Sequence, residues 1–184
     1  MATKTALSWE EFLAAGKPCQ RWEYVDGEVR FMQPTDAQHG AVNHEISAAL
    51  GSLDTSEWLS VGADVAFTMA GGEWLCPDAA VVRRSRFEGG VVPSGPAPFP
   101  PAVAFEVCSP GDKASDLERK RYLYRLNGVT QVWVDPETET VAVISPKRPV
   151  RYFGPGETAV IDELPGFAMN LFPLESKRVR DGRT

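Results

Sequence analysis

Histidine, cysteine and long apolar runs are scarce in this chain of 184 residues. Its two histidines, His39 and His44, give little support to a zinc site, which takes several nitrogen or sulfur ligands. Its three cysteines, Cys19, Cys76 and Cys108, cannot all pair within one chain, so we expect reduced thiols. No segment approaches the roughly 18 apolar residues of a membrane span, and the N-terminus carries no signal-peptide run. We therefore expect a cytoplasmic protein that has no membrane partner.

Positive charge is also in short supply, with 19 Lys and Arg residues against 25 Asp and Glu residues and a formal net charge of −6. This balance argues against a protein coated in basic patches for nucleic acid, although it allows a local basic strip. The length is that of one domain, and such a chain buries enough surface to fold without disulfides or a metal. Glycine and proline are plentiful, at 16 and 15 residues, which indicates many short elements joined by turns.

The pattern of turns and apolar periodicity predicts an order of helix, hairpin, helix, hairpin, strand, helix and further strands. Asp26-Gly27, between alternating apolar positions, predicts a hairpin over residues 21–32. The other predicted elements are helices at 9–15, 38–53 and 114–127, a hairpin joining 64–69 to 73–82 with an irregular point at Pro77, a loop at 83–101, strands at 103–107, 129–134, 140–144 and 151–153, and a basic tail at 174–184. We expect one domain over 1–184 with a mixed α/β or α+β fold, in which helices flank a central mixed sheet between an N-terminal hairpin and C-terminal strands.

The segment from 103 to 134 predicts a strand, a helix and a second strand joined by a right-handed crossover, so that the two strands are parallel. The first strand, VAFEV, carries Glu106 within an apolar run. Because burying a charge without a partner is costly, Glu106 requires a lysine, a hydrogen-bond donor or a metal ion. A structural ion pair and a functional carboxylate both remain open for this residue.

Asp78 lies between Pro77 and the apolar run AAVV, at the junction of a predicted strand. A turn residue after proline is the ordinary interpretation of this position. Two carboxylates on neighbouring strands, Asp78 and Glu106, form a hard-cation site that suits magnesium. A lysine beside such a site orients a water molecule or neutralises charge on a phosphoryl group.

The helix that follows Glu106 offers that lysine. Asp116, Lys120 and Tyr124 are spaced four residues apart and share one helix face. One interpretation is a surface ion pair between Asp116 and Lys120, and the other is a Lys120 that reaches back over the strand of Glu106. We expect three leucines to form much of the buried side of the helix, with Tyr124 beside them: Leu117, Leu123 and Leu126.

These stretches resemble the Uma2 family, which is grouped with the PD-(D/E)XK restriction-endonuclease-like nucleases. The similar stretches are RWEYVDGEV (21–29), HG (39–40), PDAAVV (77–82), FEVCSP (105–110), the run at 116–136 and LPGF (164–167). The resemblance covers about residues 8–173 and is most specific between Glu106 and Pro136. It implies a restriction-endonuclease-like core, a metal-dependent endonuclease that hydrolyses DNA, and a homodimer.

The resemblance also implies roles for individual residues. Asp78 fills the aspartate of the Pro-Asp motif, and Glu106 fills the acidic position of the (D/E)XK strand. The position two residues on, a lysine in other nucleases of this group, is Cys108 here, whereas the resembled family places its lysine on the next helix, where Lys120 matches. Asp78, Glu106 and the backbone carbonyl of Val107 are thus expected to hold Mg²⁺ or Mn²⁺, with Lys120 positioning the attacking water.

Two further residues match the family with an open role. Glu23 is either an outer or additional metal ligand, or an exposed hairpin carboxylate. His39 either contacts a phosphate or caps the helix that follows. Two alternatives to a DNA endonuclease also remain: a non-catalytic, binding or self-associating module on the same fold, and a metal-dependent phosphohydrolase that acts on a small phosphate.

Two basic clusters flank the expected site in the sequence. Segment 113–125 holds five basic residues against two acidic ones, and Arg83, Arg84 and Arg86 follow Asp78. They are expected either to form an electrostatic footprint for a phosphate backbone or to be ordinary solvated surface. Trp133 and the loop at 91–101 are the candidate elements of a dimer interface, although a core position suits Trp133 equally well.

Overall fold

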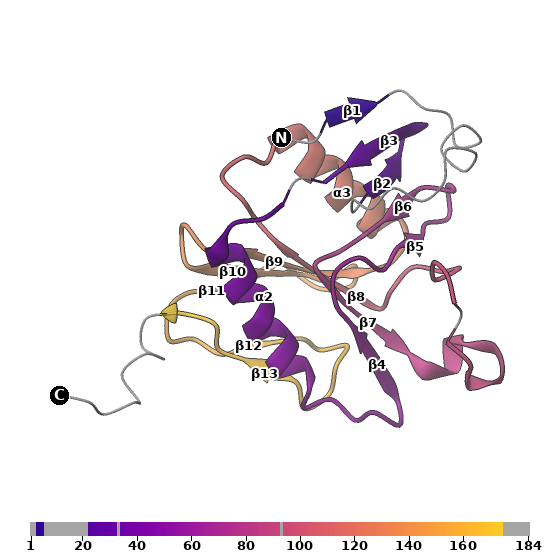
Figure 1. Cartoon of the computed structure of the whole chain (residues 1–184). Helices are drawn as coiled ribbons and strands as arrows, with labels where there is room; N and C mark the ends of the chain where they lie inside the picture. Colours follow the sequence, from indigo (N-terminus) through magenta and orange to yellow (C-terminus); the bar gives the residue numbers. More distant parts are fainter. Residues whose placement is uncertain (1–2, 6–21, 33, 93, 175–184) are drawn as a thin grey trace.

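The computed structural model describes residues 3–5, 22–32, 34–92 and 94–174 (Figure 1). The helix expected at 9–15, Cys19 and the tail from 175 onward lie outside these residues. In chain order the elements are β1 (Thr3–Thr5), β2 (Trp22–Val25), β3 (Glu28–Phe31), α2 (Ala37–Leu50), β4 (Trp58–Val61), β5 (Phe67–Thr68), β6 (Trp74–Leu75), β7 (Ala79–Arg83), η1 (Arg84–Arg86), η2 (Glu88–Gly90), β8 (Val103–Val107), α3 (Ala114–Leu126), β9 (Thr130–Asp135), β10 (Thr140–Ile144), β11 (Arg151–Phe153), β12 (Ala159–Val160) and β13 (Ala168–Met169).

The larger sheet has six strands in the order β11-β10-β9-β8-β7-β4. Strands β8 and β9 are parallel and are connected through α3, which confirms the predicted parallel pairing, and the other neighbours in this sheet are antiparallel. The expected mixed α+β architecture with a central mixed sheet is therefore present.

The two faces of this sheet belong to two cores, as the alternation in VAFEV predicts. Val103, Phe105 and Val107 pack in one core with Val42 and Ile46 of α2. Ala104 packs in the other core with residues of α3 and of the smaller sheet. Figure 1 shows this division, with α2, β12 and β13 on one side and α3 with the smaller sheet on the other.

The smaller sheet has the strand order β1-β3-β2-β6-β5. The predicted hairpin at 21–32 is present as β2 and β3, and its turn residues Asp26 and Gly27 have φ values of 54° and 77°. Positive φ at both central residues is the requirement of a type I′ turn, which Asp-Gly meets at low cost. This hairpin carries Glu23 toward the larger sheet.

The second predicted hairpin is shorter than expected. Strands β5 and β6 pair antiparallel, but the chain then leaves the smaller sheet at Leu75 and enters the larger one at Ala79. Pro77 lies where the chain passes from one sheet to the other, which confirms the irregular point predicted at this residue. Asp78 is consequently the last residue before β7 rather than part of a hairpin strand.

Other differences have simple physical causes. Helix α2 ends at Leu50, where Gly51 forms its C-cap, three residues before the predicted end. Strand β4, with its short WLSV pattern, and the two-residue strands β12 and β13 were not expected.

Leu126 is 62% exposed, so its expected place on the buried side of α3 is wrong. Two residues advance a helix by about 200°, which turns Leu126 away from the face that carries Tyr124.

The two α-helices in the described ranges have 14 and 13 residues, and no helix there is long and apolar enough to cross a membrane.

Candidate active site

Asp78, directly before strand β7, lies beside Glu106 on the neighbouring strand β8. The backbone N–H of Asp78 donates to the carbonyl of Phe105 over 3.0 Å, and the N–H of Val107 donates to Oδ2 of Asp78 over 2.8 Å. Both carboxylates are 5% exposed. The antiparallel pairing of β7 with β8 therefore brings together the two acidic residues that the sequence singles out.

Helix α3 supplies two partners for Glu106. Lys120 Nζ lies 2.9 Å from Oε2 of Glu106, and the hydroxyl of Tyr124 donates to Oε1 over 2.6 Å. Lys120 is 7% exposed and Tyr124 is fully buried, so the surface interpretation of the Lys120 face is wrong. Asp116, from the same helix face, lies 3.5 Å from Nη1 of Arg30.

Glu23 joins this cluster from strand β2. Its Oε1 lies 3.0 Å from Lys120 Nζ and accepts a hydrogen bond of 3.0 Å from the backbone N–H of Cys76. Glu23 is 3% exposed, which excludes an exposed hairpin carboxylate. One buried ammonium is thus shared by carboxylates from two sheets.

The cluster strongly perturbs its own ionisation. Burial raises the pKa of Glu106 to about 7; Lys120 opposes this change, and the charges of Asp78 and Glu23 add to it. Burial and the charge of Glu106 also raise the pKa of Tyr124 well above its ordinary value, which keeps this hydroxyl a hydrogen-bond donor. The three acidic side chains together exceed the charge that Lys120 balances, so the site favours an added cation.

His39 approaches Asp78 from helix α2. Asp36 is the N-cap of this helix and its Oδ1 accepts from the N–H of His39 over 2.8 Å, so the expectation that His39 caps the helix is wrong. The ring of His39 instead lies with Nδ1 3.1 Å from Ser109 Oγ and with Nε2 3.3 Å from Oδ1 of Asp78. Ser109 lies in the FEVCSP stretch, but sequence reasoning gave it no role.

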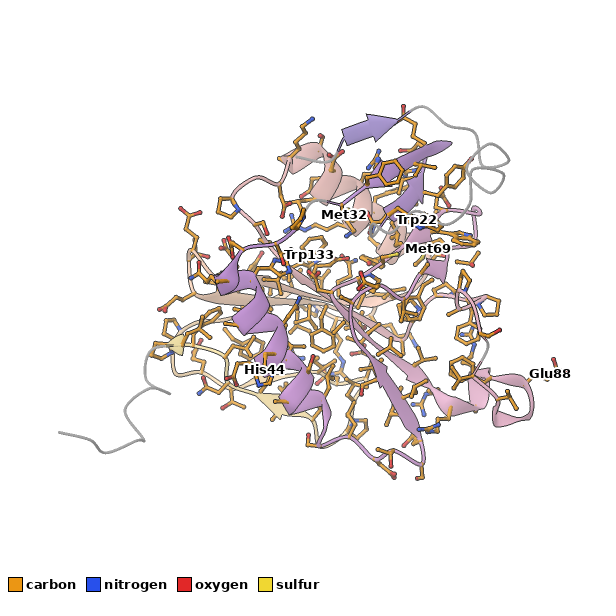
Figure 2. The ribbon with its side chains drawn as sticks, viewed as in Figure 1. Trp22, Met32, His44, Met69, Glu88 and Trp133 are labelled. Atoms are coloured by element: carbon orange, nitrogen blue, oxygen red, sulfur yellow. The ribbon has the colours of Figure 1, made fainter. Side chains whose placement is uncertain are left out.

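These residues line a cavity of about 400 Å³ between the hairpin, the start of α2 and the first turns of α3. Met32 and Trp133, labelled in Figure 2, form part of its apolar lining. Six acidic residues and three basic ones line the cavity, so its charge favours cations. Arg30 is one of the three basic residues and was not anticipated, because it reads as an ordinary polar position of a hairpin strand.

The donor chemistry fits a hard divalent cation with an incomplete protein shell. Within residues 3–5, 22–32, 34–92 and 94–174, no three His, Cys, Asp or Glu side chains are grouped so as to hold a metal ion by themselves. Two carboxylates line one cavity: Asp78, directly before β7, and Glu106 on the neighbouring strand β8. Mg²⁺ characteristically takes one or two carboxylates and fills its other positions with water and phosphate oxygens.

Cys108 does not replace the lysine of other (D/E)XK strands. Burial raises the pKa of this half-buried thiol to about 11, with Asp135 and Asp112 adding to the effect. At neutral pH the group is therefore an uncharged thiol. The positively charged side chain beside Glu106 is that of Lys120, on α3.

The arginine cluster at 83–86 lies away from the site. Strand β7 has Asp78 before its first residue and Arg83 at its end, about 16 Å away along an extended strand. Arg83 pairs with Glu57 and stacks over Trp58, and Arg84 donates to the carbonyl of Thr55. The cluster thus lies at the far end of β7 from Asp78, and its contact with a phosphate backbone stays a prediction. Trp133 is 3% exposed and packs in the core, not on an outer surface.

Comparisons with known proteins agree with this architecture. The model of the Uma2 family, described as a putative restriction endonuclease, matches residues 9–172. The crystal structure of a putative nuclease belonging to DUF820, from Anabaena variabilis, superimposes with a TM-score of 0.72 at 20% sequence identity, over 84% of this chain and 89% of the other. No protein with a curated description matches the chain.

Restriction-endonuclease-like nucleases generally use divalent metals, which agrees with the excess of acidic residues around the cavity. At 20% identity the structural likeness shows a shared fold, and the match of the family model extends over most of the sequence. The chain therefore belongs to the Uma2 family, whose members are described as putative restriction endonucleases.

Proposed function

We propose that this protein is a metal-dependent nuclease that hydrolyses phosphodiester bonds of DNA, with Mg²⁺ or Mn²⁺ as its cofactor. The observation that carries the proposal is the contact of Lys120 with Glu106, beside Asp78, in a cavity with excess negative charge. The family description and the expected grouping of Asp78, Glu106 and Lys120 both support it.

Each residue has a specific task in this proposal. Asp78, Glu106 and the backbone carbonyl of Val107 would hold the cation, which would activate a water molecule and polarise the scissile phosphate. Lys120 positions the attacking water and offsets negative charge in the transition state. Glu23 contributes as the second partner that keeps the Lys120 ammonium in place.

Cleavage assays with Mg²⁺ and with Mn²⁺ on single-stranded and duplex DNA test the proposal. We expect activity in the wild type and its loss in Glu106→Ala and Lys120→Ala, with Arg84→Gln as a charge-removing control outside the site. Thermal melting of each variant verifies that it folds. Full activity in both site variants contradicts the assignment. Cleavage of small phosphoesters without DNA cleavage selects a phosphohydrolase, and the absence of both cleavage and metal binding selects a binding module.

A homodimer, which the family resemblance implies, accompanies the proposal. Directly after η2, Val91 and Val92 are 70% and 50% exposed, and exposed apolar side chains are suited to a contact between copies. Sedimentation equilibrium is expected to give twice the mass of the chain in the wild type and a lower mass in Val91→Asp. A monomer at micromolar wild-type protein contradicts the dimer.

A further inference from the structure

Two buried donors in the cavity lack acceptors. Arg30 Nε and His39 Nε2 are the only buried side-chain atoms lining the cavity, within the described ranges, that have no hydrogen-bond partner. The Arg30 side chain is 10% exposed and that of His39 is 6% exposed. A buried polar group without a hydrogen-bond partner is costly in free energy. These two atoms therefore indicate that a bound ligand supplies the missing hydrogen-bond partners.

Arg30 is held at the wall beside the carboxylates. It lies directly opposite Glu23 in the register of β2 and β3, so the two side chains share one face of the hairpin. Its terminal nitrogens lie 3.5 Å from Asp116 and 3.8 Å from Asp26, which are ionic contacts longer than hydrogen bonds. These contacts orient the guanidinium and leave Nε–H to donate to another group.

His39 presents a second N–H. A lone pair on Nε2, 3.3 Å from Oδ1 of Asp78, would be repelled by the charge of that carboxylate, so we assign the proton to Nε2, with the Ser109 hydroxyl as the donor to Nδ1. The contact with Asp78 is electrostatic and not a hydrogen bond, so Nε2 is left without a hydrogen-bond partner. Nε2–H is therefore a donor beside one of the proposed metal ligands.

The missing ligand must carry acceptor oxygens and must arrive with a cation. Both orphaned atoms are donors, whereas the lining as a whole has six acidic residues against three basic ones and repels a bare anion. A phosphate group bound together with a divalent cation satisfies both conditions. The volume of about 400 Å³ is that of a pocket for one small molecule, which is the size of one nucleotide and too small for a base-paired duplex.

We propose that the cavity takes one unpaired nucleotide of a DNA strand, with its phosphate oxygens accepting from Nε of Arg30 and Nε2 of His39. The inference rests on the proposed function for the cation and adds the form of the substrate. A base inside a duplex is paired and stacked, so its entry requires a single strand, a frayed end or an extruded nucleotide. The proposed nuclease therefore prefers single-stranded DNA to duplex.

Calorimetric titration of the full chain with thymidine 5′-monophosphate in the presence of Mn²⁺ tests the subsite, because this ligand has no phosphodiester to cleave. We expect binding at least about tenfold tighter than that of thymidine, which lacks the phosphate. Arg30→Gln and His39→Asn are each expected to weaken binding of the monophosphate roughly tenfold. Arg84→Gln is the matched control and is expected to bind as the wild type does.

Several outcomes overturn the inference. Equal binding of thymidine and its monophosphate, or wild-type affinity in both subsite variants, removes the phosphate subsite. Thermal melting verifies that each variant folds. If Arg30→Gln does not fold, Arg30→Lys replaces it, because lysine keeps the charge but lacks the Nε donor. Arg30→Lys is expected to bind thymidine 5′-monophosphate more weakly than the wild type does. Equal cleavage rates for duplex DNA and for a single strand of the same sequence would contradict the inference that the cavity takes only an unpaired nucleotide.

A separate titration with Mn²⁺ alone distinguishes this inference from the proposed function. Mn²⁺ binding with unchanged nucleotide affinity in Arg30→Gln and His39→Asn contradicts the subsite only. The absence of Mn²⁺ binding contradicts the metal site itself, and with it the subsite that depends on the cation.

Discussion

Lys120 on helix α3 lies 2.9 Å from Glu106 on strand β8, although 14 positions separate the two residues in the sequence. In the strand itself, the second position after Glu106 is a neutral thiol. Because only the position of the ammonium matters to a reacting phosphate, a lysine from the helix supplies the charge that the strand lacks. The parallel crossover from β8 through α3 to β9 makes this contact possible.

Replacing Lys120 with methionine separates catalysis from metal binding. We expect Lys120→Met to lower the rate of DNA cleavage by about 100-fold or more, since it removes a positive charge aimed at the transition state. Mn²⁺ affinity is expected to stay the same or increase, because the ammonium no longer competes for the oxygens of Glu106. Cleavage rates and calorimetry measure the two effects. A parallel loss of Mn²⁺ binding in a folded variant would contradict this division of roles.

The ionisation of Glu106 predicts how stability depends on pH in the metal-free protein. Its folded pKa of about 7 exceeds the ordinary value of 4.5, mainly because of burial. Between these values the folded protein keeps a proton that the unfolded chain has lost, so the free energy of unfolding falls as the pH rises. Through this group the wild type is expected to lose about 3 kcal/mol of unfolding free energy between pH 4.5 and pH 8, and Glu106→Gln is expected to lack this loss.

Urea unfolding in EDTA at pH 4.5 and pH 8 measures this contribution. Titrating groups remote from the site act equally on the wild type and on Glu106→Gln, so the difference between their pH dependences reports Glu106 together with the neighbours coupled to it. The same pH dependence in both proteins would show that folding does not raise the pKa of Glu106 in the metal-free state.

Tyr124 is expected to act through Glu106 and not on the substrate. Tyr124→Phe removes the 2.6 Å hydrogen bond to Oε1 and is expected to lower the free energy of unfolding by about 1–3 kcal/mol. Because the hydrogen bond also orients a proposed ligand, Mn²⁺ affinity is expected to fall roughly tenfold. Urea unfolding and Mn²⁺ titration check the two effects, and unchanged Mn²⁺ affinity would show that Glu106 holds its orientation without Tyr124.

Cys108 is expected to be dispensable. Cys108→Ser is predicted to retain wild-type cleavage, because a thiol with a pKa of about 11 carries no charge at neutral pH. Cleavage rates at equal protein concentration check this result. A cleavage rate at least 10-fold lower in folded Cys108→Ser would show that Cys108 itself contributes to the reaction. This result would contradict the proposal that Lys120 supplies the function of that strand position.

The sequence predicts much of this architecture because local signals and burial agree. Asp-Gly defines the hairpin, VAFEV alternates between two cores, and the crossover follows from its strand–helix–strand pattern. Glu106 stands out because a charge inside an apolar strand needs partners. The convergence of Lys120 and Tyr124 on it follows from their shared helix face.

Other features depend on contacts between segments far apart in the chain. Glu23 and Arg30 reach the cavity only because the smaller sheet packs against α3, and His39 depends on where α2 begins relative to Asp78. The arginines after Asp78 looked adjacent in sequence but lie at the far end of a strand. The exposure of Leu126 has the same cause. The packing of distant segments covers the face of α3 that carries Tyr124 and leaves Leu126 in solvent.

The location of Mn²⁺ in crystals tests the central claim most directly. Anomalous diffraction from crystals soaked in Mn²⁺ is expected to show a peak between Asp78 and Glu106, within ligand distance of the carbonyl of Val107 and beside Lys120. The absence of a peak there at high Mn²⁺ concentration, with the cavity open to solvent, would contradict the proposed metal-dependent nuclease.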